Sequence, residues 1–146
     1  MNKGFKIFLA VVFCLFMAAC SSKGYEVKLG SFTGTPINND IVLLKNTSDV
    51  SSYLAEERFS SSDSFKNQLS EYTNEYFKNK DIIVINIRES SSSNTLKVSS
   101  VEKTESAITV KIKRKTPDRG TDALKTWSFI VELEKSDAGE VRYTII

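Results

Sequence analysis

The side chains that most often perform catalysis are scarce in this chain. It contains no histidine and only two cysteines, Cys14 and Cys20. Nucleophiles of the Ser-His-Asp and Cys-His kinds are therefore excluded, as are zinc sites that use histidine. The six glycines are scattered along the chain, so no glycine-rich loop is present to bind a phosphate.

The residual chemical patterns are weak. Ser100 and Lys103 have the S-x-x-K spacing of serine–lysine acylases, but without a companion motif chance is the better explanation. Asp118 and Asp122 share one segment and lack the dense oxygen ligands of a calcium site. Acidic residues are plentiful enough for a carboxylate-dependent cell-wall hydrolase, yet nothing selects a pair. The sequence predicts no metal, no cofactor and no enzymatic activity.

Residues 1–19 have the layout of an export signal. Lys3 and Lys6 precede a wholly apolar run at 7–17, and two alanines follow it. A membrane-spanning anchor is the alternative, but it needs about 20 apolar residues and this run is shorter. The pattern therefore favours export over a transmembrane helix.

The segment Met17-Ala18-Ala19-Cys20 resembles the lipobox of bacterial lipoproteins, with Met17 in place of the usual leucine. The resemblance implies cleavage before Cys20, acylation of that cysteine, and a domain anchored to a membrane of the bacterial cell envelope, outside the cytoplasm. Two or three acyl chains would anchor it stably, at about 0.8 kcal/mol per buried methylene. Alternatively, Cys20 is an ordinary residue after an ordinary cleavage site.

Cleavage would change the composition in ways that matter for partners. Removing 19 of the 146 residues leaves 127, enough for one domain with its own core. Loss of Lys3 and Lys6 reduces the 20 basic residues to 18, equal to the 18 acidic residues. Bulk charge therefore gives no reason to expect nucleic-acid binding. Residues 20–24 form a short tether, and 25–146 form a single domain without an internal disulfide.

The densest β-branched run, at 81–89, predicts the central strand. Both of its alternating faces are apolar apart from Asn86, so we expect layers to cover it on both sides. Shorter strands are expected at 25–29 and 41–44, and Asn46 to Asp49 offer a helix cap before Val50.

A second helix is expected after Ser60 to Ser62, with Asp63 as its cap and a break at Thr73-Asn74. One apolar stripe follows this helix, and we expect its tyrosine hydroxyls at the rim of the sheet. The stripe consists of Phe65, Leu69, Tyr72 and Tyr76.

The pattern from 81 onward predicts five strands joined in sequence as a meander. In the second of these, a bulge at Ser99-Ser100 restores the alternation of apolar residues. The third carries a basic outer side, for which the last residues of the fourth, Glu132 and Glu134, are possible cross-strand partners. The predicted fold is α+β: a mainly antiparallel meander sheet of about five to seven strands, with one or two helices on one face.

A second resemblance covers residues 63–146. It depends on the stretch 75–80, the serine-rich loop at 90–94, the strands at 96–101 and 108–114, and the segment from Pro117 to Trp127. Together these are similar to the PrcB-type domain, which forms the C-terminal part of a protease-complex protein, and to its lipoprotein relatives. The resemblance implies a non-enzymatic accessory protein that helps another exported protein to assemble or mature.

These observations leave three hypotheses. The first is a membrane-anchored assembly or protein-binding module whose partner is another exported protein. The second is a protease-inhibitor-like β domain that presents loops, and the third is the carboxylate-dependent hydrolase. The expected contact surface is the loop at 116–126 with the neighbouring basic strand. Its candidate residues are Lys111, Lys113, Arg114, Pro117, Asp118, Arg119 and Asp122.

Overall fold

The computed structural model describes residues 24–30, 38–56, 59 and 62–146. The elements in chain order are β1 (Tyr25–Leu29), β2 (Asp40–Leu44), α2 (Thr47–Leu54), α3 (Asp63–Ser70), the 3-10 turn η2 (Tyr76–Lys78), β3 (Lys80–Glu89), β4 (Thr95–Lys103), β5 (Ala107–Lys115), β6 (Lys125–Glu134) and β7 (Glu140–Ile145). The predicted export signal and Cys20 lie outside the described residues. Within them, no helix is long and apolar enough to cross a bilayer.

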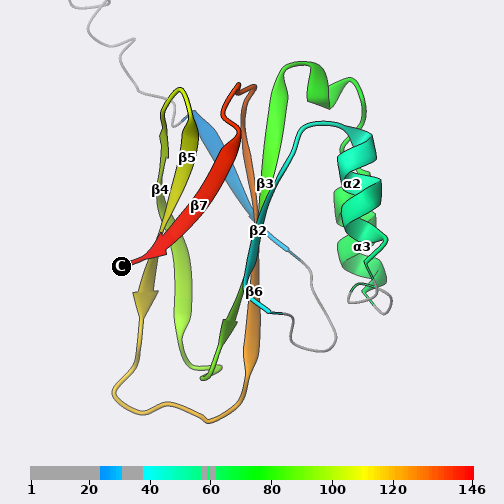
Figure 1. Ribbon diagram of the computed structural model, residues 1–146. Coiled ribbons are helices and arrows are strands. Elements are labelled where there is room, and N and C mark those ends of the chain that lie inside the picture. Colours follow the sequence, from blue (N-terminus) through cyan, green and yellow to red (C-terminus); the bar gives the residue numbers. More distant parts are fainter. Residues whose placement is uncertain (1–23, 31–37, 57–58, 60–61) are drawn as a thin grey trace, which may run out of the picture.

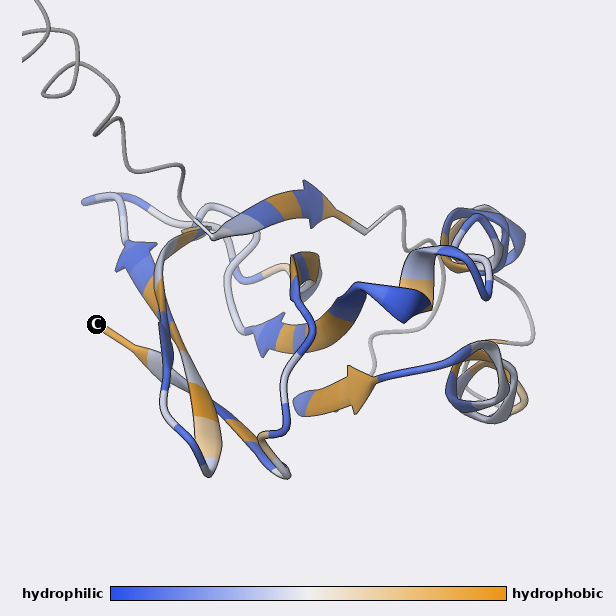
Figure 2. Cartoon of the chain, turned by 90° about the horizontal axis from the view of Figure 1, so that it is seen from above, coloured by the Kyte–Doolittle hydropathy of each residue, from blue (hydrophilic) through white to orange (hydrophobic). Residues whose placement is uncertain are grey.

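The seven strands form two sheets. Sheet A has the order β1-β6-β3-β2 and is antiparallel, while sheet B has the order β4-β5-β7. The helices α2 and α3 lie against one face of sheet A, and sheet B lies against the other (Figure 1). Viewed from above, the chain forms three layers: helices, sheet A and sheet B (Figure 2). The predicted α+β class, strand number and helix number are confirmed.

The central position of β3 follows from its sequence. Ile82 and Val84 belong to the apolar cluster beneath the helices, whereas Ile83, Ile85 and Ile87 belong to the cluster between the sheets. All five side chains are buried. The expectation that this strand is covered on both faces is therefore confirmed.

Asn86 interrupts the apolar pattern because it joins a buried hydrogen-bond network under the helices. Its amide nitrogen donates to Asp40 Oδ1 and to the Tyr53 hydroxyl, both at 2.7 Å. Its amide oxygen accepts a bond of 2.5 Å from Ser128 Oγ on β6. A fully buried amide is tolerated because its donors and its acceptor are paired.

The first helix begins as predicted, since the Asn46 side chain accepts from the Asp49 backbone N–H at 2.8 Å. The expectation for the second helix is wrong in one detail. Ser62 occupies the N-cap position of α3, and Asp63 is already in the first turn. There the carboxylate favours the helix through the helix dipole and not as the capping residue.

The apolar stripe of the second helix extends beyond the helix itself. Phe65 and Leu69 are buried on α3, which ends at Ser70, while Tyr72 follows its end and Tyr76 lies in η2. The break near Thr73-Asn74 is thus confirmed. The Tyr72 hydroxyl is not at the rim as expected, because it donates to Glu132 Oε1 in a buried bond of 2.8 Å.

Strand pairing differs in detail from a simple succession. The β4–β5 hairpin forms and shifts register between Val98 and Ser100, which confirms the predicted bulge. In contrast, β6 pairs with β3, and β7 pairs with β5 in parallel. The expected pairing of Lys111 and Lys113 with Glu132 and Glu134 is wrong, because β5 and β6 belong to different sheets. A central strand that is apolar on both faces needs a covering layer on each side, and sheet B supplies the layer opposite the helices.

The chain leaves β1 at a close approach that requires glycine. A Cβ atom on Gly30 would lie 2.6 Å from Ser128 Cβ and 3.0 Å from the Phe65 ring. The backbone here therefore packs directly against β6 and α3. The strand itself starts at Tyr25, as the sequence predicts.

Candidate functional site

The structure does not bring the predicted contact residues together on one surface. Lys111 and Lys113 point to the outer face of sheet B, where Lys111 pairs with Glu102. Arg114 alternates to the inner side, and its Nη2 lies 2.6 Å from Oε1 of Glu89, a carboxylate that is only 3% exposed. Arg114 therefore links the two sheets at one end of the sandwich and is held away from Lys113.

The other four predicted residues, Pro117, Asp118, Arg119 and Asp122, are exposed on the loop 116–124. This loop crosses from sheet B to sheet A at the end of the sandwich opposite the start of β1, which explains its length (Figure 1). It is tied to the serine-rich loop, because the Thr121 N–H donates to Ser93 Oγ at 3.2 Å and its hydroxyl lies 2.6 Å from Ser92 Oγ. In the described part of the chain, no three acidic or cysteine side chains converge to hold a metal.

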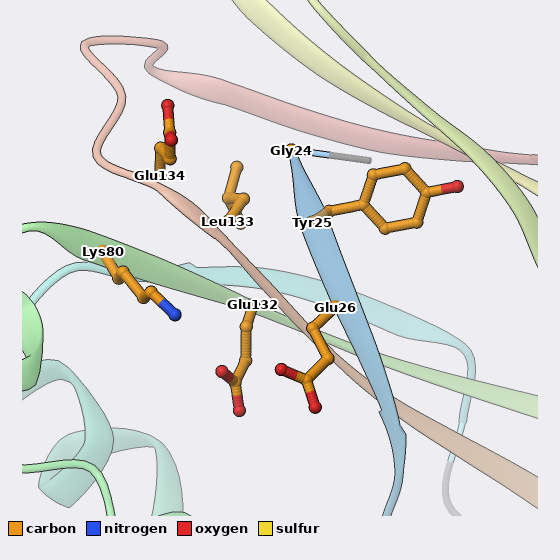
Figure 3. A pocket seen from close by; sticks show the side chains of 7 residues that line it. All are labelled: Gly24, Tyr25, Glu26, Lys80, Glu132, Leu133 and Glu134. Atoms are coloured by element: carbon orange, nitrogen blue, oxygen red, sulfur yellow. The ribbon is translucent and has the colours of Figure 1, made fainter. Parts of the chain in front are cut away.

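A polar pocket that the sequence did not predict lies where β1 crosses the end of β6. It has a volume of about 320 Å³. The residues that line it are Gly24, Tyr25, Glu26, Lys80, Glu132, Leu133 and Glu134. The carboxylates of Glu26 and Glu132 point to the same side of the sheet, with the Lys80 side chain beside them (Figure 3).

Glu132 is the centre of this pocket's electrostatics. Its carboxylate, 5% exposed, forms an ion pair with Lys28 and accepts the hydrogen bond from Tyr72. The Lys28 ammonium lies 5.5 Å from the Tyr72 ring centroid, and Lys80 lies 5.6 Å from that of Tyr76. Cations above the aromatic faces add to the stability of the cluster.

The cluster holds its groups in their ordinary charge states. Burial acts to raise the pKa of Glu132, but hydrogen bonds from Lys28 and Tyr72 outweigh it, so the pKa is lowered. The hydrogen bond to Glu132 raises the pKa of Lys28. Burial, followed by the influence of Glu132, raises the pKa of Tyr72 and Tyr76. At neutral pH the carboxylate is thus ionised, the amine charged and the phenols protonated, an arrangement suited to stability more than to proton transfer.

An apolar groove lies along the seam between the edges of the two sheets, on the side where β1 faces β4. Its volume is about 450 Å³. It is lined by Tyr25, Val27 and Leu29 from β1, Leu96, Lys97 and Val98 from β4, and Trp127 and Phe129 from β6. The Tyr25 hydroxyl donates to the Ser99 carbonyl at 3.3 Å and thereby bridges the two strands.

Both walls of the groove contain strand edges. Among the described strands, β1 pairs only with β6, and β4 pairs only with β5, so each has one unpaired edge. β1 is also short, and it pairs with β6 only from Phe129 to Leu133. The Trp127 ring nitrogen is buried and has no hydrogen-bond partner among the described residues. The groove therefore combines apolar side chains with the unpaired edges of two strands.

Part of the signal for this groove was present in the sequence. The alternation of Trp127, Phe129 and Val131 predicted one apolar face of a strand. The groove itself depends on strand pairing. Because β1 pairs with β6 only from Phe129 to Leu133, no part of β1 lies beside Trp127, which therefore lines a groove.

Comparison with known proteins gives no significant match: no family model, no curated protein and no solved structure matches the chain.

Proposed function

We propose that the chain is a membrane-anchored, non-catalytic protein-binding module of the bacterial cell envelope. The proposed anchor is a lipid on Cys20, and the proposed binding site is the groove between β1 and β4. The Met17-Ala18-Ala19-Cys20 pattern, the absence of histidine and the resemblance to the PrcB-type domain support this role. The observation on which the binding role depends is the groove, with its apolar floor between two unpaired strand edges.

The chemistry of the groove favours an extended polypeptide as the occupant. A strand placed beside β1 or β4 would satisfy the free backbone groups of that edge, and its alternate side chains would enter the groove. The bound segment would come from another exported protein, as the accessory role requires.

A matched pair of exposed leucines separates the groove from the loop 116–124 as the contact surface. Leu29 at the groove is 60% exposed, and Leu124 at the end of the loop is 50% exposed. Because neither is buried, a charge at either position should cost little stability. Tagged full-length chain carrying Leu29→Glu or Leu124→Glu is purified from solubilised membranes beside the wild type.

We expect Leu29→Glu to abolish recovery of the exported partner that accompanies the wild type, and Leu124→Glu to leave recovery unchanged. Recovery retained by Leu29→Glu and lost by Leu124→Glu would transfer the site to the loop. Mass spectrometry of the same preparations gives the state of Cys20. An unmodified Cys20 would contradict the lipid anchor, independently of the groove.

The loop 116–124 favours one second candidate, the protease-inhibitor-like domain. Inhibitory loops work when they are held in a fixed conformation before binding. Thr121 holds this loop to Ser92 and Ser93, and Leu124 is presented to solvent. Inhibition of a co-exported protease by the wild type but not by Leu124→Glu would favour this alternative over the groove.

A further inference from the structure

The outer face of sheet B is the one sheet face that no described element covers (Figure 2). Its inner face supplies Leu96, Val98 and Ile112 to the cluster between the sheets. The residues that alternate with them point outward, and most of the charged ones are basic. The basic residues on this face are Lys97, Lys111, Lys113, Lys115 and Arg142, and the acidic ones are Glu102 and Glu140.

The positive charge of this face is largely uncompensated within the described structure. Lys111 pairs with Glu102, whereas Lys97, Lys113 and Arg142 have no ion-pair partner among the described residues. Moreover, Lys97 and Lys113 are direct register partners on adjacent strands. Like charges placed opposite one another destabilise a sheet, so this arrangement opposes folding and favours a partner of negative charge.

The helix side of the molecule has no comparable excess of basic charge. Exposed acidic residues lie on and around the helices at Glu56, Asp63, Glu71 and Glu75, and they are accompanied there by Lys66 and by Lys78, which pairs with Glu75. The basic and acidic residues of 20–146 are equal in number, so the two faces differ by segregation and not by net charge. A molecule whose basic charge is concentrated on one face takes up one orientation on an anionic surface.

We propose that the outer face of sheet B lies on anionic phospholipid headgroups of the membrane that anchors the chain. The proposal rests on the proposed lipid anchor, because Cys20 precedes Tyr25 by five residues and about 17 Å of extended chain. The Tyr25 hydroxyl donates a hydrogen bond to the Ser99 carbonyl of β4, so the chain enters the fold beside sheet B. A bilayer also fits a face composed of one broad, uncovered sheet.

The helix layer then points away from the membrane, and the groove between β1 and β4 lies at the side of the molecule, open to a partner in the same envelope. Each lysine or arginine near an anionic bilayer strengthens binding by about fivefold. Removing Lys97 and Lys113 should therefore weaken the binding of this face to anionic headgroups by about 25-fold.

The test uses full-length chain in vesicles of phosphatidylcholine, alone or mixed with phosphatidylglycerol. A water-soluble amine reagent labels exposed lysines, and mass spectrometry measures labelling at Lys97 and Lys113 against Lys66 and Lys78 of the helix layer. We expect protection of the sheet B lysines only in the anionic vesicles, and its loss at high salt. The Lys97→Gln/Lys113→Gln variant, followed at Lys115, should lose this protection, whereas Lys78→Gln/Arg88→Gln should retain it.

Flotation with neutral vesicles tests the lipid anchor separately. A chain that does not float with these vesicles would overturn the proposed membrane anchoring. If the chain floats but Lys97 and Lys113 are labelled equally in both vesicle types, the proposal that sheet B lies on the membrane is overturned. The proposed anchor and groove are unaffected by that result. Protection of Lys97 and Lys113 by soluble polyglutamate but not by anionic vesicles also overturns it, in favour of an acidic protein partner.

Discussion

Sheets A and B share one apolar layer but treat their other faces differently. The second face of sheet A lies beneath the helices, and its polar residues Asn86, Ser128 and Glu132 are all buried and hydrogen-bonded. The second face of sheet B lies in solvent and places Lys97 opposite Lys113. These three buried polar residues all have hydrogen-bond partners, whereas the exposed face of sheet B tolerates an unfavourable charge pair.

This difference separates stability from recognition within one small domain. The residues buried beneath the helices and between the two sheets are those whose loss should unfold the protein. The outer face of sheet B and the groove beside it hold the residues whose change should alter binding and leave the fold in place. The following predictions test that separation.

The largest effect is expected in the central strand. Ile85 is fully buried between the sheets, so Ile85→Ala should lower the free energy of unfolding by about 2–5 kcal/mol through lost burial and a cavity. Lys113→Ala, on the exposed face, should change it by less than about 0.5 kcal/mol. Urea denaturation of both variants measures the contrast, and equal losses would contradict it.

The next effect concerns the buried amide. Asn86→Ala leaves Ser128 Oγ without its acceptor and should cost about 1–3 kcal/mol. Asn86→Ala combined with Ser128→Ala should cost less than the sum of the two single changes, because no orphaned hydroxyl remains. Additive losses in thermal unfolding would show that the network contributes nothing beyond its separate members.

Glu132 should make stability depend on pH. Its pKa is lowered from 4.5 in the folded state, so its contribution is present above pH 4.5 and is lost as the pH falls through the folded-state pKa. The raised pKa of Tyr72 has the opposite sign, and its contribution is complete below pH 10 and is lost at higher pH. Unfolding followed across this range should show a plateau between two losses.

Glu132→Gln is the control for the acid limb. It keeps an acceptor for Tyr72 but loses the ion pair with Lys28, and at neutral pH it should cost about 1 kcal/mol, the difference between a charged and a neutral hydrogen bond. The variant should also lose part of the acid dependence. An unchanged pH profile would assign that dependence to other carboxylates.

The smallest effect should have the opposite direction. Lys113→Glu replaces a repulsive cross-strand pair with an attractive one opposite Lys97, so it should stabilise the protein by about 0.2–1 kcal/mol. Lys113→Gln, which removes only the repulsion, should give a smaller gain. A loss of stability from Lys113→Glu would mean that the basic face already has a compensating partner within the chain.

The local features were predictable from sequence because they depend on neighbouring residues. The cap at Asn46, the bulge near Ser99 and the double burial of β3 all follow from side-chain type and spacing. The direction of the Arg114 side chain was not predictable from sequence, because it depends on Glu89, which lies on another strand in the other sheet. The cluster around Glu132 was missed because Lys28, Tyr72 and Glu132 are far apart in the sequence.

The sequence by itself determined the class of fold, the positions of the strands and helices, and the shortage of catalytic side chains. Tertiary structure alone decided that β6 returns to β3, that β7 lies parallel to β5, and that a groove remains between β1 and β4. The physical reason is that alternation fixes which side chains share a face, whereas strand partners depend on which apolar faces can be buried together once the whole chain is assembled.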